Sequence, residues 1–168
     1  MKKAGKAEVI LVLDVSGSMS GSAIRNSAAA ARSFVDRAEA GTYIGVVSFS
    51  TSARLLLGLT EVTDAASRTA IKAAVPTTTS ATTCIGCGMQ TALTELNASS
   101  RDMAQMMALL TDGGENVSPR VAQVLPSVIA AGVMVNSIGL GAAADRQLQD
   151  IADQTGGAYY FAPGGDQQ

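Results

Sequence analysis

The sequence predicts an α/β fold, a three-layer sandwich in which helices cover both faces of a mostly parallel, doubly wound, six-stranded sheet. Aliphatic runs alternate along the chain with segments of helical period, which is the pattern of such sandwiches. One pair of strand-like runs is joined by only two or three polar residues. So short a link permits a hairpin but no crossover, so we expect one antiparallel edge strand.

The strands and helices follow from composition and period. Residues 8–14 (EVILVLD) form a nearly continuous aliphatic run, as expected for a central strand buried on both faces. Residues 103–111 fit helix or strand by period, but their end in a Thr-Asp-Gly-Gly loop favours a strand. Strands are predicted over residues 8–14, 43–50, 53–59, 103–111, 133–140 and 158–162. Helices are predicted over residues 24–38, 64–75, 86–96, 118–132 and 145–154.

Turn and capping residues mark the ends of these elements. Gly41 and Pro76 end the first two helices, and Thr63 or Asp64 can cap the second. Pro126 should kink or split the fourth helix, because proline lacks the backbone donor.

At 168 residues with 47% hydrophobic content, the chain fits one domain that can bury its own core. We expect this domain over residues 8–163, with an N-terminal extension of residues 1–7 and a tail of residues 164–168. A core strand so close to each end indicates a domain cut from a larger protein.

Charge and composition exclude several functions. The chain has 12 basic and 14 acidic residues and no basic run beyond Lys2-Lys3, so we expect no nucleic-acid partner. No window approaches the length of a spanning apolar helix, and the N-terminus lacks a signal-peptide pattern, so we expect a soluble segment without membrane insertion. With no His and only two Cys, a metal must be held by oxygen atoms, which favours Mg²⁺, Mn²⁺ or Ca²⁺.

Oxygen-bearing side chains gather in three predicted loops. In open α/β sheets, sites form outside the carboxyl ends of the strands, where these three loops should meet. Two carboxylates shared with hydroxyls and water leave a cation short of negative charge and free to accept an outside ligand. The first loop taken alone could instead cap a helix, and Asp112 taken alone could be a turn residue. The loops contain Asp14, Ser16 and Ser18, then Thr82 and Thr83, then Asp112.

Three motifs resemble those of von Willebrand factor A domains and integrin I domains, which share a Rossmann-like fold. The run Asp14-Val15-Ser16-Gly17-Ser18 resembles their DxSxS signature, the first part of a metal-ion-dependent adhesion site. The run Thr83-Cys84-Ile85-Gly86-Cys87-Gly88 is similar to their threonine loop, and Leu109-Leu110-Thr111-Asp112-Gly113 to their third motif. The likeness extends from about residue 8 to residue 162, and these runs are most similar to the A domains of calcium-activated chloride channel regulators.

This resemblance implies a function and a site. It implies a non-catalytic module that binds one divalent cation, Mg²⁺ before Mn²⁺ or Ca²⁺, and through it an acidic side chain of a partner protein. It also favours the cell surface or the extracellular space. Glu115 and Asn116 would orient waters or contact the partner, and Thr82 immediately precedes the ligand threonine and stays an alternative to it. The metal ligands implied by the family pattern are Asp14, Ser16, Ser18, Thr83 and Asp112.

Cys84 and Cys87 form a C-x-x-C pair at a predicted helix N-terminus, a place that lowers a thiol pKa. Three interpretations stay open: buried structural thiols, a local disulfide, or a redox pair that tunes metal affinity through Thr83. No further Cys supports zinc.

Two other function classes compete with the hypothesis of an adhesion module. An enzyme would need an acid, a base or a nucleophile, but Ser16 stands where a haloacid dehalogenase-type phosphatase needs its second Asp, and no phosphate-binding G-x-x-x-x-G-K-[ST] loop occurs. The other class is a structural or assembly module whose metal site only stabilises the fold.

Overall fold

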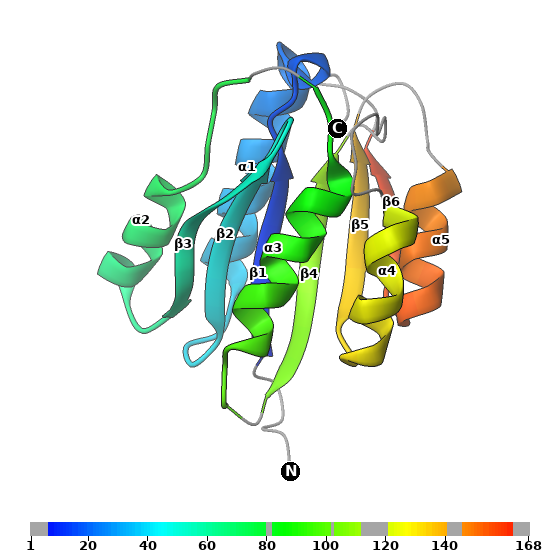
Figure 1. Cartoon of the computed structure of the whole chain (residues 1–168). Coiled ribbons are helices and arrows are strands. Elements are labelled where there is room, and N and C mark those ends of the chain that lie inside the picture. Colours follow the sequence, from blue (N-terminus) through cyan, green and yellow to red (C-terminus); the bar gives the residue numbers. More distant parts are fainter. Residues whose placement is uncertain (1–6, 80–81, 102, 112–120, 141–145, 163–168) are drawn as a thin grey trace.

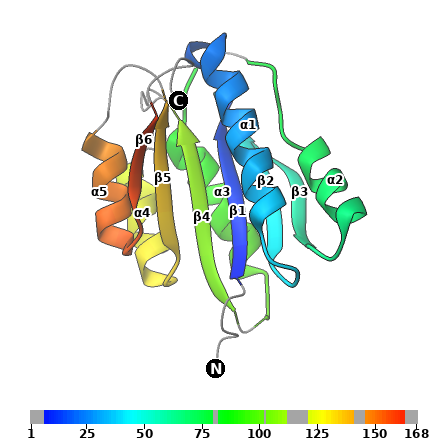
Figure 2. The ribbon, with the colours of Figure 1, turned by 180° about the vertical axis from the view of Figure 1, so that it is seen from behind.

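The computed structural model describes residues 7–79, 82–101, 103–111, 121–140 and 146–162. Six strands form one sheet, flanked by helices on both faces (Figures 1 and 2). The strands are β1 (Ala7–Asp14), β2 (Tyr43–Phe49), β3 (Ala53–Glu61), β4 (Ala104–Thr111), β5 (Met134–Leu140) and β6 (Tyr159–Ala162). The helices are η1 (Gly17–Met19), α1 (Ser22–Arg37), α2 (Ala65–Ala73), α3 (Ile85–Asn97), α4 (Val121–Ala130) and α5 (Arg146–Thr155).

The strand order is β3-β2-β1-β4-β5-β6, and every pair is parallel except β2 with β3. The predicted fold class is thereby confirmed, including the antiparallel strand at the sheet edge. The sheet order reverses direction between β2 and β4, which both pair with β1. This switch point places the end of β1 between two outgoing loops, where a site is expected.

Side-chain alternation along β1 builds a core on each face of the sheet. Ile10 and Val12 join the core under α3, α4 and α5, whereas Val9, Leu11 and Leu13 join the core under α1 and α2. All five side chains are almost completely buried. The aliphatic run therefore forms the central strand because only a strand covered on both faces can bury each of its residues.

Helix α3 approaches the sheet closely at Gly88. A Cβ atom there would come within 2.6 Å of the Phe49 ring and 2.9 Å of Val12. Because glycine has no Cβ, the first turn of α3 can lie directly against β1 and β2. This contact holds the N-terminus of α3 near the carboxyl end of β1.

The structure decides one of the two alternatives for the fourth predicted helix. Helix α4 runs without a break through Pro126, so the proline does not split it, and a kink stays a prediction. The lost hydrogen bond would have gone to the carbonyl of Ala122, and both residues are exposed, so water can reach that carbonyl. The predicted start of this helix at residue 118 lies outside the described residues.

Among the described residues, no helix has the length and apolar character needed to cross a bilayer.

Candidate metal centre

The site is built on the last residue of β1. The Asp14 side chain is fully buried, and its carboxylate is held from two sides. The backbone N–H of Ser16 donates to Oδ1 at 2.8 Å, and the hydroxyl of Thr111 donates to Oδ2 at 2.6 Å. These bonds fix the orientation of the carboxylate. Carboxylate oxygens are the ligands that hard cations such as Mg²⁺ prefer, so an oriented carboxylate at the end of β1 is a candidate ligand.

The loop after β1 is anchored at both ends. The backbone N–H of Val15 donates to the carbonyl of Phe49 at 2.8 Å, which ties the loop to the end of β2. Ser16 is buried at the N-cap position of η1, and Met19, the last residue of η1, buries its side chain in the core under α1 and α2. Ser18 lies within η1, and its side chain is outside what the structure describes. The backbone therefore turns Ser16 inward beside Asp14.

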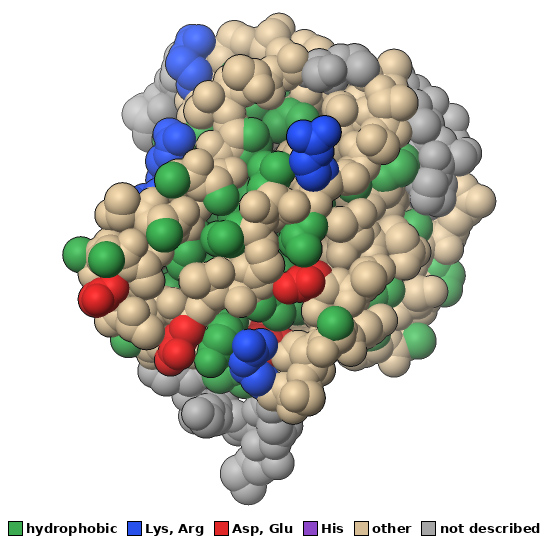
Figure 3. Space-filling model, turned by 60° about the vertical axis from the view of Figure 1, so that its left-hand side comes forward, with side chains coloured by type: hydrophobic (Ala, Val, Ile, Leu, Met, Phe, Trp, Pro, Cys, Tyr) green, Lys and Arg blue, Asp and Glu red, His purple; other side chains and the backbone are tan. Residues whose placement is uncertain are grey.

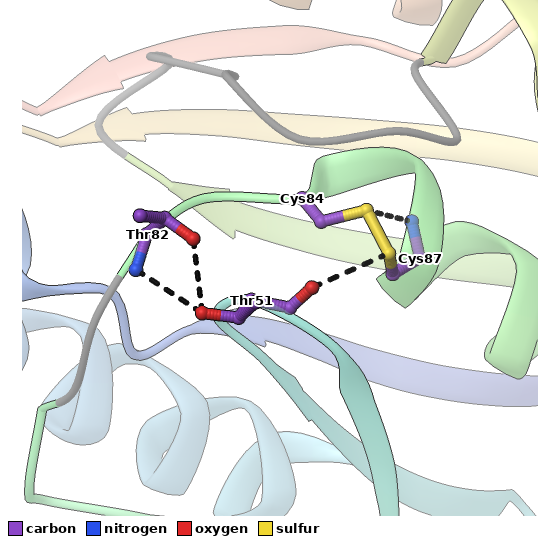
Figure 4. Close-up of a disulfide and its surroundings, with 4 residues drawn as sticks. All are labelled: Thr51, Thr82, Cys84 and Cys87. Atoms are coloured by element: carbon purple, nitrogen blue, oxygen red, sulfur yellow. Dashed lines mark hydrogen bonds between the residues drawn. A yellow bond between two sulfur atoms is a disulfide. The ribbon is translucent and has the colours of Figure 1, made fainter.

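The two adjacent threonines before α3, Thr82 and Thr83, have different surroundings. Thr83 is buried with 5% of its surface exposed, whereas Thr82 is exposed. The hydroxyls of Thr82 and Thr51 lie 2.9 Å apart, so Thr82 bonds to the tip of the β2–β3 hairpin (Figure 4). Thr83 is thus the threonine that faces the interior, directly before α3.

Cys84 and Cys87 are joined by a disulfide across the first turn of α3, with Cα atoms 5.2 Å apart (Figure 4). Cys84 is fully buried and occupies the N-cap position of α3, where its sulfur accepts a hydrogen bond from the backbone N–H of Cys87 at 3.1 Å. The Cys87 sulfur lies 3.9 Å from the carbonyl oxygen of Thr51. The disulfide therefore directly follows Thr83 in the chain and lies close to the hairpin tip that bonds to Thr82.

The third loop begins directly after Thr111. Strands β4 and β1 are parallel neighbours in register from Ala7 with Ala104 to Leu13 with Leu110, so Thr111 and Asp14 end side by side. The predicted site residues Asp112, Glu115 and Asn116 lie outside the described residues. The role of Thr111 could not be predicted although it lies within the third motif, because a threonine beside a loop aspartate gives no sign of its hydrogen-bond partner.

A second buried carboxylate, Glu8, lies at the opposite end of β1, where an arginine balances its negative charge. Burial raises its pKa, but hydrogen bonds from Ser99, Gln105 and Arg101 outweigh burial and hold the pKa below the ordinary value. Arg101 also packs over the Tyr43 ring at 3.7 Å. Glu8 therefore belongs to a structural ion pair with Arg101 and is not a candidate metal ligand.

The fold and this geometry define an α/β domain with an oriented carboxylate and inward hydroxyls at the carboxyl end of the sheet. The family model for the von Willebrand factor type A domain matches residues 8–167, and the chain belongs to this family. Members of the family typically mediate metal-dependent protein interactions.

The chain is similar in sequence to calcium-activated chloride channel regulators. It is 31% identical over 160 residues to calcium-activated chloride channel regulator 1 of Sus scrofa, covering 94% of this chain and 17% of that protein. It is also 31% identical over 157 residues to calcium-activated chloride channel regulator 4 of Homo sapiens, covering 91% of this chain and again 17% of that protein. The chain thus spans less than a fifth of these relatives.

Solved structures share the fold at lower identity. A von Willebrand factor type A protein from Catenulispora acidiphila has a TM-score of 0.82 at 22% identity, over 93% of this chain and 38% of the other. Proximal thread matrix protein 1 of the mussel byssus, solved with zinc in its MIDAS motif, has a TM-score of 0.79 at 24% identity, over 94% and 42%.

Proposed function

We propose that this domain binds one divalent cation in a metal-ion-dependent adhesion site and uses it to bind a carboxylate of a partner protein. Asp14, Ser16, Ser18, Thr83 and Asp112 would hold the cation, some of them through water. When bound, the cation supplies the positive charge that recognises the partner's acidic side chain.

The proposal rests mainly on one observation: the buried Asp14 carboxylate at the end of β1 is oriented by hydrogen bonds from the Ser16 backbone N–H and the Thr111 hydroxyl. Ser16 and Thr83 are buried beside the same end of the sheet. A site of oxygen ligands alone suits Mg²⁺, which we propose as the ion, ahead of Mn²⁺ or Ca²⁺. The mussel protein of the same fold was solved with zinc in this motif, which supports a cation in this position.

We further propose that the domain works as part of a larger extracellular or cell-surface protein. The Cys84–Cys87 disulfide supports this compartment, because disulfides persist in oxidising environments. The partner would be a protein and not a nucleic acid, since the chain carries net charge -2.

Capture of partners from the surface fraction of the source cells tests this proposal. Wild-type protein in Mg²⁺ should retain a set of proteins that is lost in a chelator and lost with Asp112→Ala. Asp36→Asn is the matched control, because Asp36 is an exposed carboxylate on α1 that pairs with Lys72 away from the site. Retention of the same proteins in chelator and by Asp112→Ala would contradict a metal-dependent interaction.

A structural role is the second candidate. The hydrogen bond from Thr111 to Asp14 ties β4 to β1 without any partner, so a cation here could serve the fold alone. In that case metal would raise the melting temperature while partner capture stayed independent of metal.

A further inference from the structure

A polar pocket of about 310 Å³ opens beside the candidate metal centre. It lies between the hairpin that joins β2 to β3 and the segment that follows α2. Hydroxyl groups dominate its lining, and none of them hydrogen-bonds through its side chain to a described residue. They belong to Ser48, Ser50, Ser52, Thr78 and Thr79.

Arg54 is the charged residue of this lining. It pairs with Ser48 across the antiparallel register of β2 and β3, which places both side chains on the same face of the sheet. Arg54 is exposed and makes no hydrogen bond or ion pair with any described residue. Its guanidinium is therefore available to a ligand, and that group matches a carboxylate with two parallel hydrogen bonds.

The pocket and the metal centre share a wall. Val15 lines the pocket and lies in the chain between Asp14 and Ser16. The hairpin and the segment after α2 both reach the end of the sheet where β1 ends (Figure 1). One extended partner segment can therefore reach both places.

Charge on this face favours an acidic ligand. Figure 3 brings the side of β3 and α2 forward, and among the described side chains its upper part shows Lys and Arg, whereas acidic side chains appear only in the lower part. The upper part is the end of the molecule that carries the candidate metal centre. On the visible face, the described charged side chains of this upper part are basic, which suits a partner rich in carboxylates.

We propose that this pocket receives a second acidic side chain of the same partner segment whose first carboxylate binds the metal. The Arg54 guanidinium would hold this second carboxylate, and the hydroxyls of the pocket would donate further hydrogen bonds to it. The inference rests on the proposed metal-dependent function and adds the partner's chemistry: two acidic residues at a fixed separation. Because the two contacts act together, the second adds affinity without a second loss of association entropy.

Synthetic peptides test this inference on the full chain saturated with Mg²⁺. Each peptide has an Asp and a Glu separated by a flexible spacer of increasing length, and each has a matched version with Gln in place of Glu. At the best spacing, the two-acid peptide should bind about tenfold more tightly than its Gln version, as expected for a hydrogen-bonded charge pair.

Arg54→Gln should remove this gain and leave Mg²⁺ affinity unchanged, and Arg54→Lys should restore part of it. Arg37→Gln, in the last turn of α1, is the matched control and should keep the full gain. No gain at any spacing, or a gain that survives Arg54→Gln, would overturn the inference. A gain that depends on Arg54 but not on Mg²⁺ would also overturn it, because the two contacts would then be unlinked.

A Mg²⁺ titration without peptide separates the two failures. If Mg²⁺ does not bind, the proposed function fails. If Mg²⁺ binds and the one-acid peptides bind with it, but the second acid adds nothing, only the pocket inference fails.

Discussion

At the scale of single residues, the candidate metal centre depends on the hydrogen bond that the Thr111 hydroxyl donates. This hydroxyl is fully buried and donates to the Asp14 carboxylate from the neighbouring strand. The second Asp14 oxygen is held by the loop itself, through the backbone N–H of Ser16. A carboxylate fixed in this way is oriented before any cation binds, so little order has to be gained on binding.

Thr111→Val tests this positioning role, because valine keeps the shape of threonine and removes only the hydroxyl. We expect Mg²⁺ affinity to fall by about 10- to 100-fold, as for other residues that orient metal ligands. The free energy of unfolding should fall by about 1–3 kcal/mol, since a buried acceptor loses its donor. Calorimetric titration and denaturant unfolding measure the two effects. Thr94→Val, an exposed threonine of α3, should change neither appreciably.

The two adjacent threonines give a second residue-scale prediction. Thr83→Val should weaken Mg²⁺ binding by about tenfold or more, because the buried hydroxyl is the proposed ligand. Thr82→Val should leave it unchanged, because that hydroxyl is exposed and bonds to Thr51. Parallel calorimetric titrations compare the pair. A larger loss from the Thr82 variant would reverse the assignment.

At the scale of elements, the N-terminus of α3 places Thr83, the proposed ligand, beside the disulfide. Cys84 caps the helix and follows Thr83 directly, and the bond to Cys87 closes the first turn. The helix cannot shift outward from the sheet without losing the close contact at Gly88. The disulfide therefore fixes the backbone from which Thr83 projects.

Reduction of this disulfide should lower Mg²⁺ affinity by about fivefold or more, the lower range of coupling between two sites. A small dithiol in excess would reduce the bond by thiol–disulfide exchange, and calorimetric titration before and after measures the change. The double variant Cys84→Ser with Cys87→Ser should resemble the reduced protein and ignore the dithiol. Equal affinity in oxidised and reduced protein would dispose of the coupling.

Much of the arrangement of strands and helices can be predicted from the sequence, because burial of a strand on both faces of the sheet leaves a direct trace in composition. The run at residues 8–14 could only be a central strand, and the short link after Phe49 allowed only a hairpin. The register shifts around Val46 left no such trace, because they depend on packing between strands. The unbroken course of α4 through Pro126 depends on which face meets water, which spacing alone leaves open.

Candidate site residues were predictable for a similar reason, and their contacts were not. The DxSxS motif leaves only Val15 between Asp14 and Ser16, so the local sequence already brings these two residues together. The bond between Thr111 and Asp14 joins positions 97 residues apart, and only the folded sheet brings them together. Likewise, the spacing of Cys84 and Cys87 allowed thiols or a disulfide.

At the scale of the whole molecule, the two ends of β1 carry buried carboxylates with different surroundings. Asp14 at the carboxyl end accepts hydrogen bonds from the Ser16 N–H and the Thr111 hydroxyl, whereas Glu8 at the amino end has the Arg101 guanidinium at 2.8 Å. The stabilising charge pair and the candidate metal centre are therefore separated by the length of the strand. Changes at one should affect the other little.

Acid should destabilise the protein partly through Glu8. Its pKa is lowered in the folded state from the ordinary value of 4.5, so its contribution is present above that pH and is lost as the pH falls through the folded pKa. Wild-type stability in urea should therefore fall more steeply between about pH 5 and about pH 3 than that of Glu8→Gln. Parallel pH profiles for Glu8→Gln and wild type would contradict this role.

Calorimetric titration of the wild-type chain with Mg²⁺, accompanied by thermal melting, tests the central claim most directly. The account predicts one ion per chain, a melting temperature that rises with occupancy, and loss of both effects in Asp14→Asn. Absence of binding heat and of any melting shift with saturating Mg²⁺, Mn²⁺ and Ca²⁺ would contradict it.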